Sequence, residues 1–206
     1  MEHDRIRAPN IIKSPYALHK ITPSLLENAR MRFAPRFKGY PYPLVAVMLG
    51  GSTNKYTLTE NAMGKVIDEL NNLLENIEGT LLITPSRRTG AQNVAMLEHA
   101  FSKHPRVYIY DGKEENPYMG LLALADYLVV SNDSVNMMSE ARATGKPLYI
   151  LSLPGHQGTK PARFALRLKK EGSARPLDNV LESWNYEVRD DMAQLAIAVR
   201  ERLAGL

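Results

Sequence analysis

A short polar stretch from Ser131 to Glu140 contains the residues with the clearest chemical potential. It follows an apolar run at residues 127–130 that is typical of a buried strand, and its small polar side chains are good helix N-caps. A strand that turns directly into a helix directs backbone N–H groups and the helix dipole at one spot, where an anion can bind. We therefore expect Ser131, Asp133 and Ser134 to bind the diphosphate of a sugar nucleotide. The same side chains would cap the helix without any ligand, and Glu140 would then be a solvated surface residue.

The loop after residues 44–49, an apolar run that predicts a central strand, is a second candidate wall of this site. Its sequence is Gly50-Gly51-Ser52, which lacks the spacing of a dinucleotide-binding fingerprint or a P-loop. Paired glycines either form a tight turn or let a phosphate or sugar approach bare backbone, and both interpretations stay open. If strands one and four are neighbours, this loop faces Ser131 across the ligand crevice.

Basic residues would supply positive charge for an anionic ligand at the carboxyl ends of the predicted strands. Arg87 and Arg88 follow the second strand and could clamp a phosphate, or could form a solvated loop pair. Lys160 follows the fifth strand and adds positive charge near the same rim. His156, in a loop with glycines on both sides, is the one histidine placed for catalysis. No two of the five histidines have metal-ligand spacing, so we expect no metal.

The alternation of apolar runs and amphipathic segments predicts an α/β fold. The expected strands are 44–49, 80–84, 106–110, 127–130 and 148–151, and the expected helices are 23–33, 60–77, 92–102, 118–125, 161–170 and 190–203. The connections are too short for antiparallel return, so a parallel sheet with right-handed crossovers follows. We expect a Rossmann-like three-layer sandwich with strand order 3-2-1-4-5.

Length and composition bound the domain organisation. The 206 residues divide into a lead-in or linker segment with one helix, 1–42, and a Rossmann-like domain, 43–206. Hydrophobic residues make up 44% of the chain, yet no stretch reaches the apolar length of a membrane span. Cysteine is absent and no signal peptide is expected, which is compatible with a cytoplasmic location. The net charge of +4 suits anionic small ligands, and no aromatic-plus-basic stripe indicates nucleic-acid binding.

The sequence resembles a known family over nearly its whole length. The main match runs from Asn116 to Glu140 and continues through Thr144-Gly145-Lys146-Pro147. Supporting matches are Glu2-His3-Asp4, Gly50-Gly51-Ser52, Thr84-Pro85-Ser86-Arg87-Arg88-Thr89, Ala174-Arg175-Pro176 and Leu181-Glu182-Ser183-Trp184. These residues resemble the ELM mitochondrial-fission family, whose bacterial members are described as predicted nucleoside-diphosphate-sugar epimerases. That family is similar to GT-B glycosyltransferases and UDP-N-acetylglucosamine 2-epimerases, which contain two Rossmann-like domains.

The resemblance implies that this chain is the C-terminal half of a GT-B-like fold. In GT-B proteins this half binds the nucleotide donor, with the diphosphate at a helix N-terminus and the ribose on a Glu of that helix. These positions correspond here to Ser134 and Glu140. The substrate would be a UDP-sugar or another NDP-sugar, with no cofactor. The acceptor site would belong to a missing N-terminal GT-B-like domain, so the chain alone would be inactive.

Three functions follow from this resemblance. The first is metal-independent glycosyl transfer, in which backbone amides at 131–134 and nearby basic side chains stabilise the departing diphosphate. The second is nucleotide-sugar epimerisation in the same pocket. The third is a non-catalytic, GT-B-derived interaction module. The last helix is expected to expose an apolar face that packs on another copy of the chain; that face comprises Met192, Leu195, Ala196 and Val199.

Overall fold

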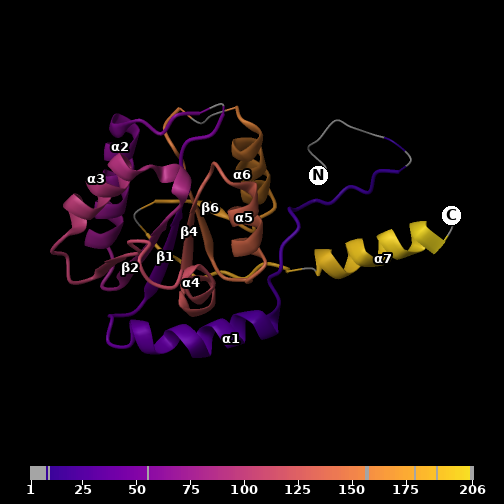
Figure 1. Cartoon of the computed structure of the whole chain (residues 1–206), viewed down its shortest axis with the longest axis horizontal. Coiled ribbons are helices and arrows are strands. Elements are labelled where there is room, and N and C mark those ends of the chain that lie inside the picture. Colours follow the sequence, from indigo (N-terminus) through magenta and orange to yellow (C-terminus); the bar gives the residue numbers. More distant parts are fainter. Residues whose placement is uncertain are drawn as a thin grey trace.

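The computed structural model describes residues 8, 10–54, 56–155, 158–178, 180–188 and 190–204. Figure 1 shows a central sheet with helices on both faces. The strands are β1 (Leu44–Leu49), β2 (Thr80–Pro85), β3 (Val107–Ile109), β4 (Tyr127–Ser131), β5 (Leu148–Leu151) and β6 (Arg175–Pro176). The helices are α1 (Pro23–Phe33), α2 (Glu60–Glu75), α3 (Ala91–Phe101), α4 (Tyr118–Leu124), α5 (Val135–Arg142), α6 (Lys160–Lys170) and α7 (Asp191–Ala204), with short 3-10 helices η1 (Ala34–Phe37) and η2 (Arg87–Thr89).

The sheet has the order β3-β2-β1-β4-β5-β6, and every pairing is parallel. The predicted order 3-2-1-4-5 is therefore confirmed and extended by one edge strand. That strand, Arg175–Pro176, pairs with only two residues of β5, Tyr149 and Ile150. Two residues that include a proline carry no periodicity, which is why the sequence pattern did not reveal it.

Alternate residues of each central strand enter two separate cores, as the pleat requires. Ala46 and Met48 of β1 join a cluster with residues of α1, α4, α5 and α6, whereas Val45, Val47 and Leu49 join a cluster with residues of α2 and α3. All six β1 residues are buried, as expected for a strand covered on both faces. The three-layer α/β sandwich is thus confirmed.

The segment before β1 packs against this sandwich. Tyr16, Ile21, Phe33 and Phe37 are buried in the same cluster as Ala46 of β1. At the other end of the chain, α7 has no buried residue, and Figure 1 shows it projecting away from the sheet domain. No helix in the described part of the chain is long and apolar enough to cross a membrane.

Candidate functional site

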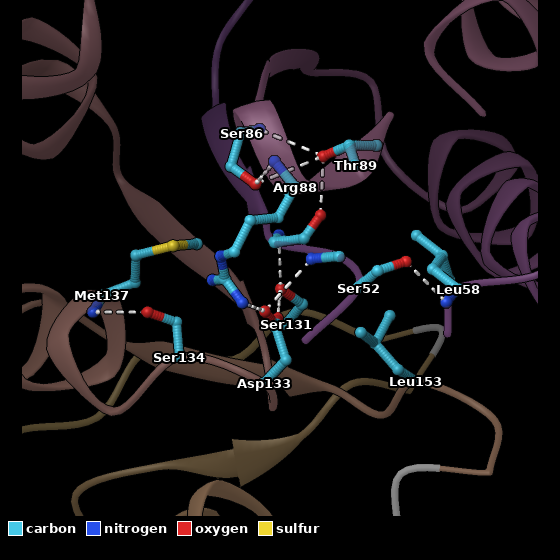
Figure 2. A network of polar contacts seen from close by, with 12 residues as sticks. Ser52, Leu58, Ser86, Arg88, Thr89, Ser131, Asp133, Ser134, Met137 and Leu153 are labelled. Carbon is cyan, nitrogen blue, oxygen red and sulfur yellow. Dashed lines mark hydrogen bonds and ion pairs between the residues drawn. The ribbon is translucent and has the colours of Figure 1, made fainter. Parts of the chain in front are cut away.

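The carboxyl ends of β1, β2 and β4 meet in one hydrogen-bonded network, shown in Figure 2. Its centre is the carboxylate of Asp133, whose side chain is 0% exposed. One carboxylate oxygen accepts from the Ser131 hydroxyl at 2.6 Å, and the other accepts from the Gly51 N–H at 3.0 Å. The Arg88 guanidinium lies 2.7 Å from the same carboxylate, and the Gly50 N–H donates to Ser131 Oγ at 2.7 Å. Three loops that are distant in sequence are thereby held together.

Both glycines of the β1 loop are required by this packing. A Cβ atom on Gly50 would lie 2.1 Å from both carboxylate oxygens of Asp133. A Cβ atom on Gly51 would lie 2.1 Å from the backbone oxygen of Arg88. Neither separation is sterically allowed, so close contact between protein loops accounts for Gly50-Gly51. This contact between loops is a third explanation, beside the tight turn and the ligand approach that the sequence left open.

The loop after β2 is fixed to the end of β1 by Thr89 and Ser86. The Thr89 hydroxyl donates to the Gly50 carbonyl at 2.6 Å, and the Ser52 N–H donates to the Arg88 carbonyl at 2.9 Å. Ser86 and Thr89 form a capping box around η2. Ser52 in turn accepts from the Leu58 N–H at 3.0 Å, so its hydroxyl organises the approach to α2.

The N-terminus of α5 begins beside this network. Ser134 is the N-cap, and its hydroxyl accepts from the Met137 N–H at 3.3 Å. Asn132 is buried, and its side-chain oxygen accepts from the Leu153 N–H at 3.0 Å, which ties the β4 loop to the chain after β5. The first N–H groups of a helix have no partner within the helix, so this end can receive an anion.

Glu140, predicted to bind ribose, is held by a partner from α4. Its carboxylate accepts from the Tyr118 hydroxyl at 2.5 Å. Burial and the adjacent Glu140 carboxylate raise the pKa of Tyr118, so the hydroxyl keeps its proton and remains a donor. A carboxylate has about four acceptor positions, so this bond still leaves capacity for a further hydroxyl.

The sequence matches the mitochondrial fission ELM1 family over residues 1–203. This chain belongs to that family. The mitochondrial fission protein ELM1 of Arabidopsis thaliana is 34% identical over 198 residues, which are 95% of this chain and 46% of that protein. The uncharacterized protein RP120 of Rickettsia prowazekii is 28% identical over 208 residues, 97% of this chain and 57% of that protein. The chain therefore spans about half the length of these two relatives.

Solved structures of similar shape are more distant. A putative UDP-N-acetylglucosamine 2-epimerase from Listeria monocytogenes superposes with a TM-score of 0.48 at 13% identity, covering 91% of this chain and 41% of that one. MurG from Acinetobacter baumannii gives a TM-score of 0.46 at 17% identity, covering 86% of this chain and 45% of that one. With TM-scores below 0.5, these matches carry no argument about the site, and the fold of this ELM1-family chain rests on its own strand order.

Two of the remaining predicted residues, Arg87 and Lys160, are exposed. Arg87 is exposed in η2, next to Arg88, and Lys160 is exposed at the start of α6. His156 lies outside the described residues. Within the described part of the chain, no group of three or more His, Cys, Asp or Glu side chains could hold a metal ion.

Sequence reasoning missed four residues of this site: Ser86, Thr89, Tyr118 and Asn132. Thr89 could have been found, because Ser86 and Thr89 have the spacing of a capping box at the end of a predicted strand. Tyr118 carried no such signal, since it is 22 residues from Glu140 and only the packing of α4 on α5 brings the two together.

Proposed function

We propose that this chain binds a nucleotide sugar at the carboxyl edge of its sheet, without a metal, as the donor half of a GT-B-like site. The observation that carries the proposal is the reversal of winding between β1 and β4, with the capped N-terminus of α5 at that point. Ligands of open α/β sheets bind in such a crevice, and anions bind at such a helix end.

The contacts within the loop network divide the predicted residues into two groups. Asp133, Ser131 and Arg88 hold one another, so they would shape the loops around the diphosphate. Their opposite charges offset each other, and Asp133 would otherwise repel an anion. The diphosphate would then be bound by the first turn of α5, by the Ser134 hydroxyl and by the exposed Arg87, and Lys160 at the start of α6 would add positive charge.

The ribose would bind at Glu140. Tyr118 fixes one carboxylate oxygen and thereby orients the other acceptor positions. In glycosyl transfer, the bond from the sugar's anomeric carbon to the diphosphate breaks while a bond to an acceptor oxygen forms, and the amides of α5 stabilise the charge left on the diphosphate. The acceptor and the base that takes its proton would come from outside this chain. Epimerisation would use the same donor pocket.

A second candidate is an interaction module without turnover. The fission name of the Arabidopsis thaliana relative and the uncovered helix α7 favour it. It predicts that the domain folds normally but binds no nucleotide. The two candidate functions therefore differ in whether the chain binds a nucleotide, which can be measured.

Calorimetry with UDP, GDP and UDP-linked sugars tests the proposal directly. We expect saturable binding that weakens with salt, because the ligand is anionic. Arg87→Ala and Ser134→Ala should weaken the binding of nucleoside diphosphates, and Glu140→Gln, which can still accept from Tyr118, should weaken binding through the ribose. Arg200→Ala, on the exposed surface of α7, is the matched control and should leave nucleotide binding unchanged. If no nucleotide binds at millimolar concentration, or if all variants bind equally, the donor-site proposal is wrong.

A further inference from the structure

A cavity of about 600 Å³ lies where the strands of the sheet begin, at the end opposite the candidate nucleotide site. We call this end, formed by the amino ends of the strands, the amino edge. The lining of the cavity combines the approaches to β1, β4 and β5 with the chain that follows β6. The lining residues are Tyr42, Pro43, Asp126, Tyr127, Pro147, Ser183, Trp184 and Asn185. Its volume falls within the range of small-molecule sites, roughly 300 to 1,000 Å³. Nothing in the proposed nucleotide chemistry uses it.

Three aromatic side chains line this amino-edge cavity. Tyr42 is 68% exposed. Tyr127 is positioned by a hydroxyl contact of 3.1 Å with Ser183. Trp184 is anchored because its indole N–H donates to the Gly172 carbonyl at 3.2 Å. The rings of Tyr127 and Trp184 are therefore held in place, whereas Tyr42 extends into solvent.

The charge of the lining has one sign. Among the described residues that line the cavity, Asp126 is the one with a charged side chain, and none is Lys, Arg or His. One Asp126 oxygen accepts from the Leu44 N–H at 2.7 Å, which fixes the carboxylate at the cavity. The nearby Lys146 ammonium donates to the carbonyls of Ala123 and Ala125 at the end of α4. It also interacts electrostatically with Asp126, and so offsets part of the charge of that carboxylate.

The ring of Trp184 already interacts with one cation, the guanidinium of Arg175. The guanidinium carbon of Arg175 lies 4.3 Å from the centroid of Trp184. Aromatic faces attract cations through their quadrupole, and groups of aromatic rings are the usual site for quaternary ammonium ions. A fixed carboxylate beside such rings adds an attraction that a neutral ligand would not gain.

We propose that the amino-edge cavity binds a quaternary or fully methylated ammonium group of the choline type. In this proposal the lining residues Tyr42, Tyr127 and Trp184 contact its methyl groups, and Asp126 supplies the opposite charge. The group could belong to a free small molecule or to a phospholipid head group, which have the same chemistry. This proposal is independent of nucleotide binding at the carboxyl edge.

The test uses Trp184, the one tryptophan of the chain, as a reporter of its own cavity. Tetramethylammonium or choline, at constant ionic strength, should change its fluorescence with a saturable midpoint in the millimolar range. The carbon analogue of choline, in which a tert-butyl group replaces trimethylammonium, should bind at least about fivefold more weakly, because it lacks the charge. Equal effects of choline and its carbon analogue would overturn the proposal.

Substitutions then separate the cavity from unspecific binding. Tyr42→Ala should weaken choline binding about two- to fivefold, while Tyr42→Phe keeps the ring and should not. Asp126→Asn should also weaken it, although the amide oxygen can still accept from Leu44. Tyr110→Ala, near the opposite edge of the sheet, is the control and should leave binding unchanged. Unaltered binding in both Tyr42→Ala and Asp126→Asn contradicts the proposal.

The source of the ammonium group is distinguished with vesicles. Cosedimentation with phosphatidylcholine vesicles, but not with phosphatidylglycerol vesicles, together with free choline binding, assigns a lipid head group. Binding of free choline without cosedimentation assigns a soluble ligand. Cosedimentation without any response to free choline or tetramethylammonium overturns the assignment of this cavity.

Discussion

The Arg88 guanidinium and the Asp133 carboxylate lie 2.7 Å apart and join the loop after β2 to the loop after β4, across the end of β1. The Asp133 side chain is fully buried, while the Arg88 side chain is 38% exposed. Asp133 also accepts hydrogen bonds from Gly51 and Ser131. The pair therefore fixes the shape of the candidate site. The charges of Arg88 and Asp133 largely neutralise each other.

Substitution of one partner of the Arg88–Asp133 pair tests how far protein stability depends on this contact. Arg88→Ala leaves the Asp133 carboxylate buried with two neutral donors, and we expect a loss of about 1–3 kcal/mol in the free energy of unfolding, reduced from the buried-pair range because water reaches Arg88. Arg87→Ala, the exposed neighbour, is the matched control and should change stability by less than about 0.5 kcal/mol. Urea unfolding of both variants measures the difference. Equal stabilities would show that the pair does not hold the loops.

Two glycine-to-alanine substitutions, at a crowded and at an open position, provide a second matched comparison of stability. Gly50→Ala places a Cβ 2.1 Å from the Asp133 carboxylate, and we expect it to destabilise by about 2–3 kcal/mol through overpacking. Gly64→Ala lies inside α2 with nothing within 4 Å of its added Cβ, so it should stabilise by about 0.5–1 kcal/mol. Thermal unfolding of the two variants should give shifts of opposite sign. A tolerated Gly50→Ala would instead mean that the loops can separate.

The sequence predicts the sheet far better than it predicts the contacts at its edge. Strand order follows from the alternation of buried runs and amphipathic helices, because parallel strands require crossovers. The role of Gly50 could not be decided, since it depends on the position of the Asp133 side chain 83 residues away. The partner of Glu140 and the amino-edge cavity depend likewise on packing between elements. The spacing of residues along the chain does not determine these distances in the fold.

Helix α7 is expected to mediate self-association of the isolated chain. Val199 and Leu203 lie four positions apart on one face of α7 and are 41% and 66% exposed. We expect the mass of the chain in sedimentation equilibrium to rise with concentration, and the double variant Val199→Glu with Leu203→Glu to remove that rise. Arg200→Glu, also exposed on α7, is the control and should leave the rise in mass intact. A wild-type chain that is monomeric at all concentrations would contradict the prediction.

Lys146 should make stability depend on pH in the alkaline range. Burial lowers the pKa of Lys146 to about 8, from a model-peptide value near 10.5 that applies to the unfolded chain. Between these values the unfolded chain binds more protons than the folded chain, so the contribution of Lys146 to stability rises with pH. Each unit of difference corresponds to about 1.4 kcal/mol, so the gain between pH 7 and pH 10 should be about 2 kcal/mol.

The variant Lys146→Met isolates this contribution from the other groups that titrate in the same range. It removes the amine that donates to the Ala123 and Ala125 carbonyls, and it keeps a side chain of similar length. A neutral amine can still donate to both carbonyls, so the wild-type chain loses no hydrogen bond as Lys146 deprotonates. Urea unfolding at several pH values should therefore show the stability difference, wild type minus variant, increasing from pH 7 to pH 10. A constant difference would show that Lys146 keeps an ordinary pKa in the folded protein.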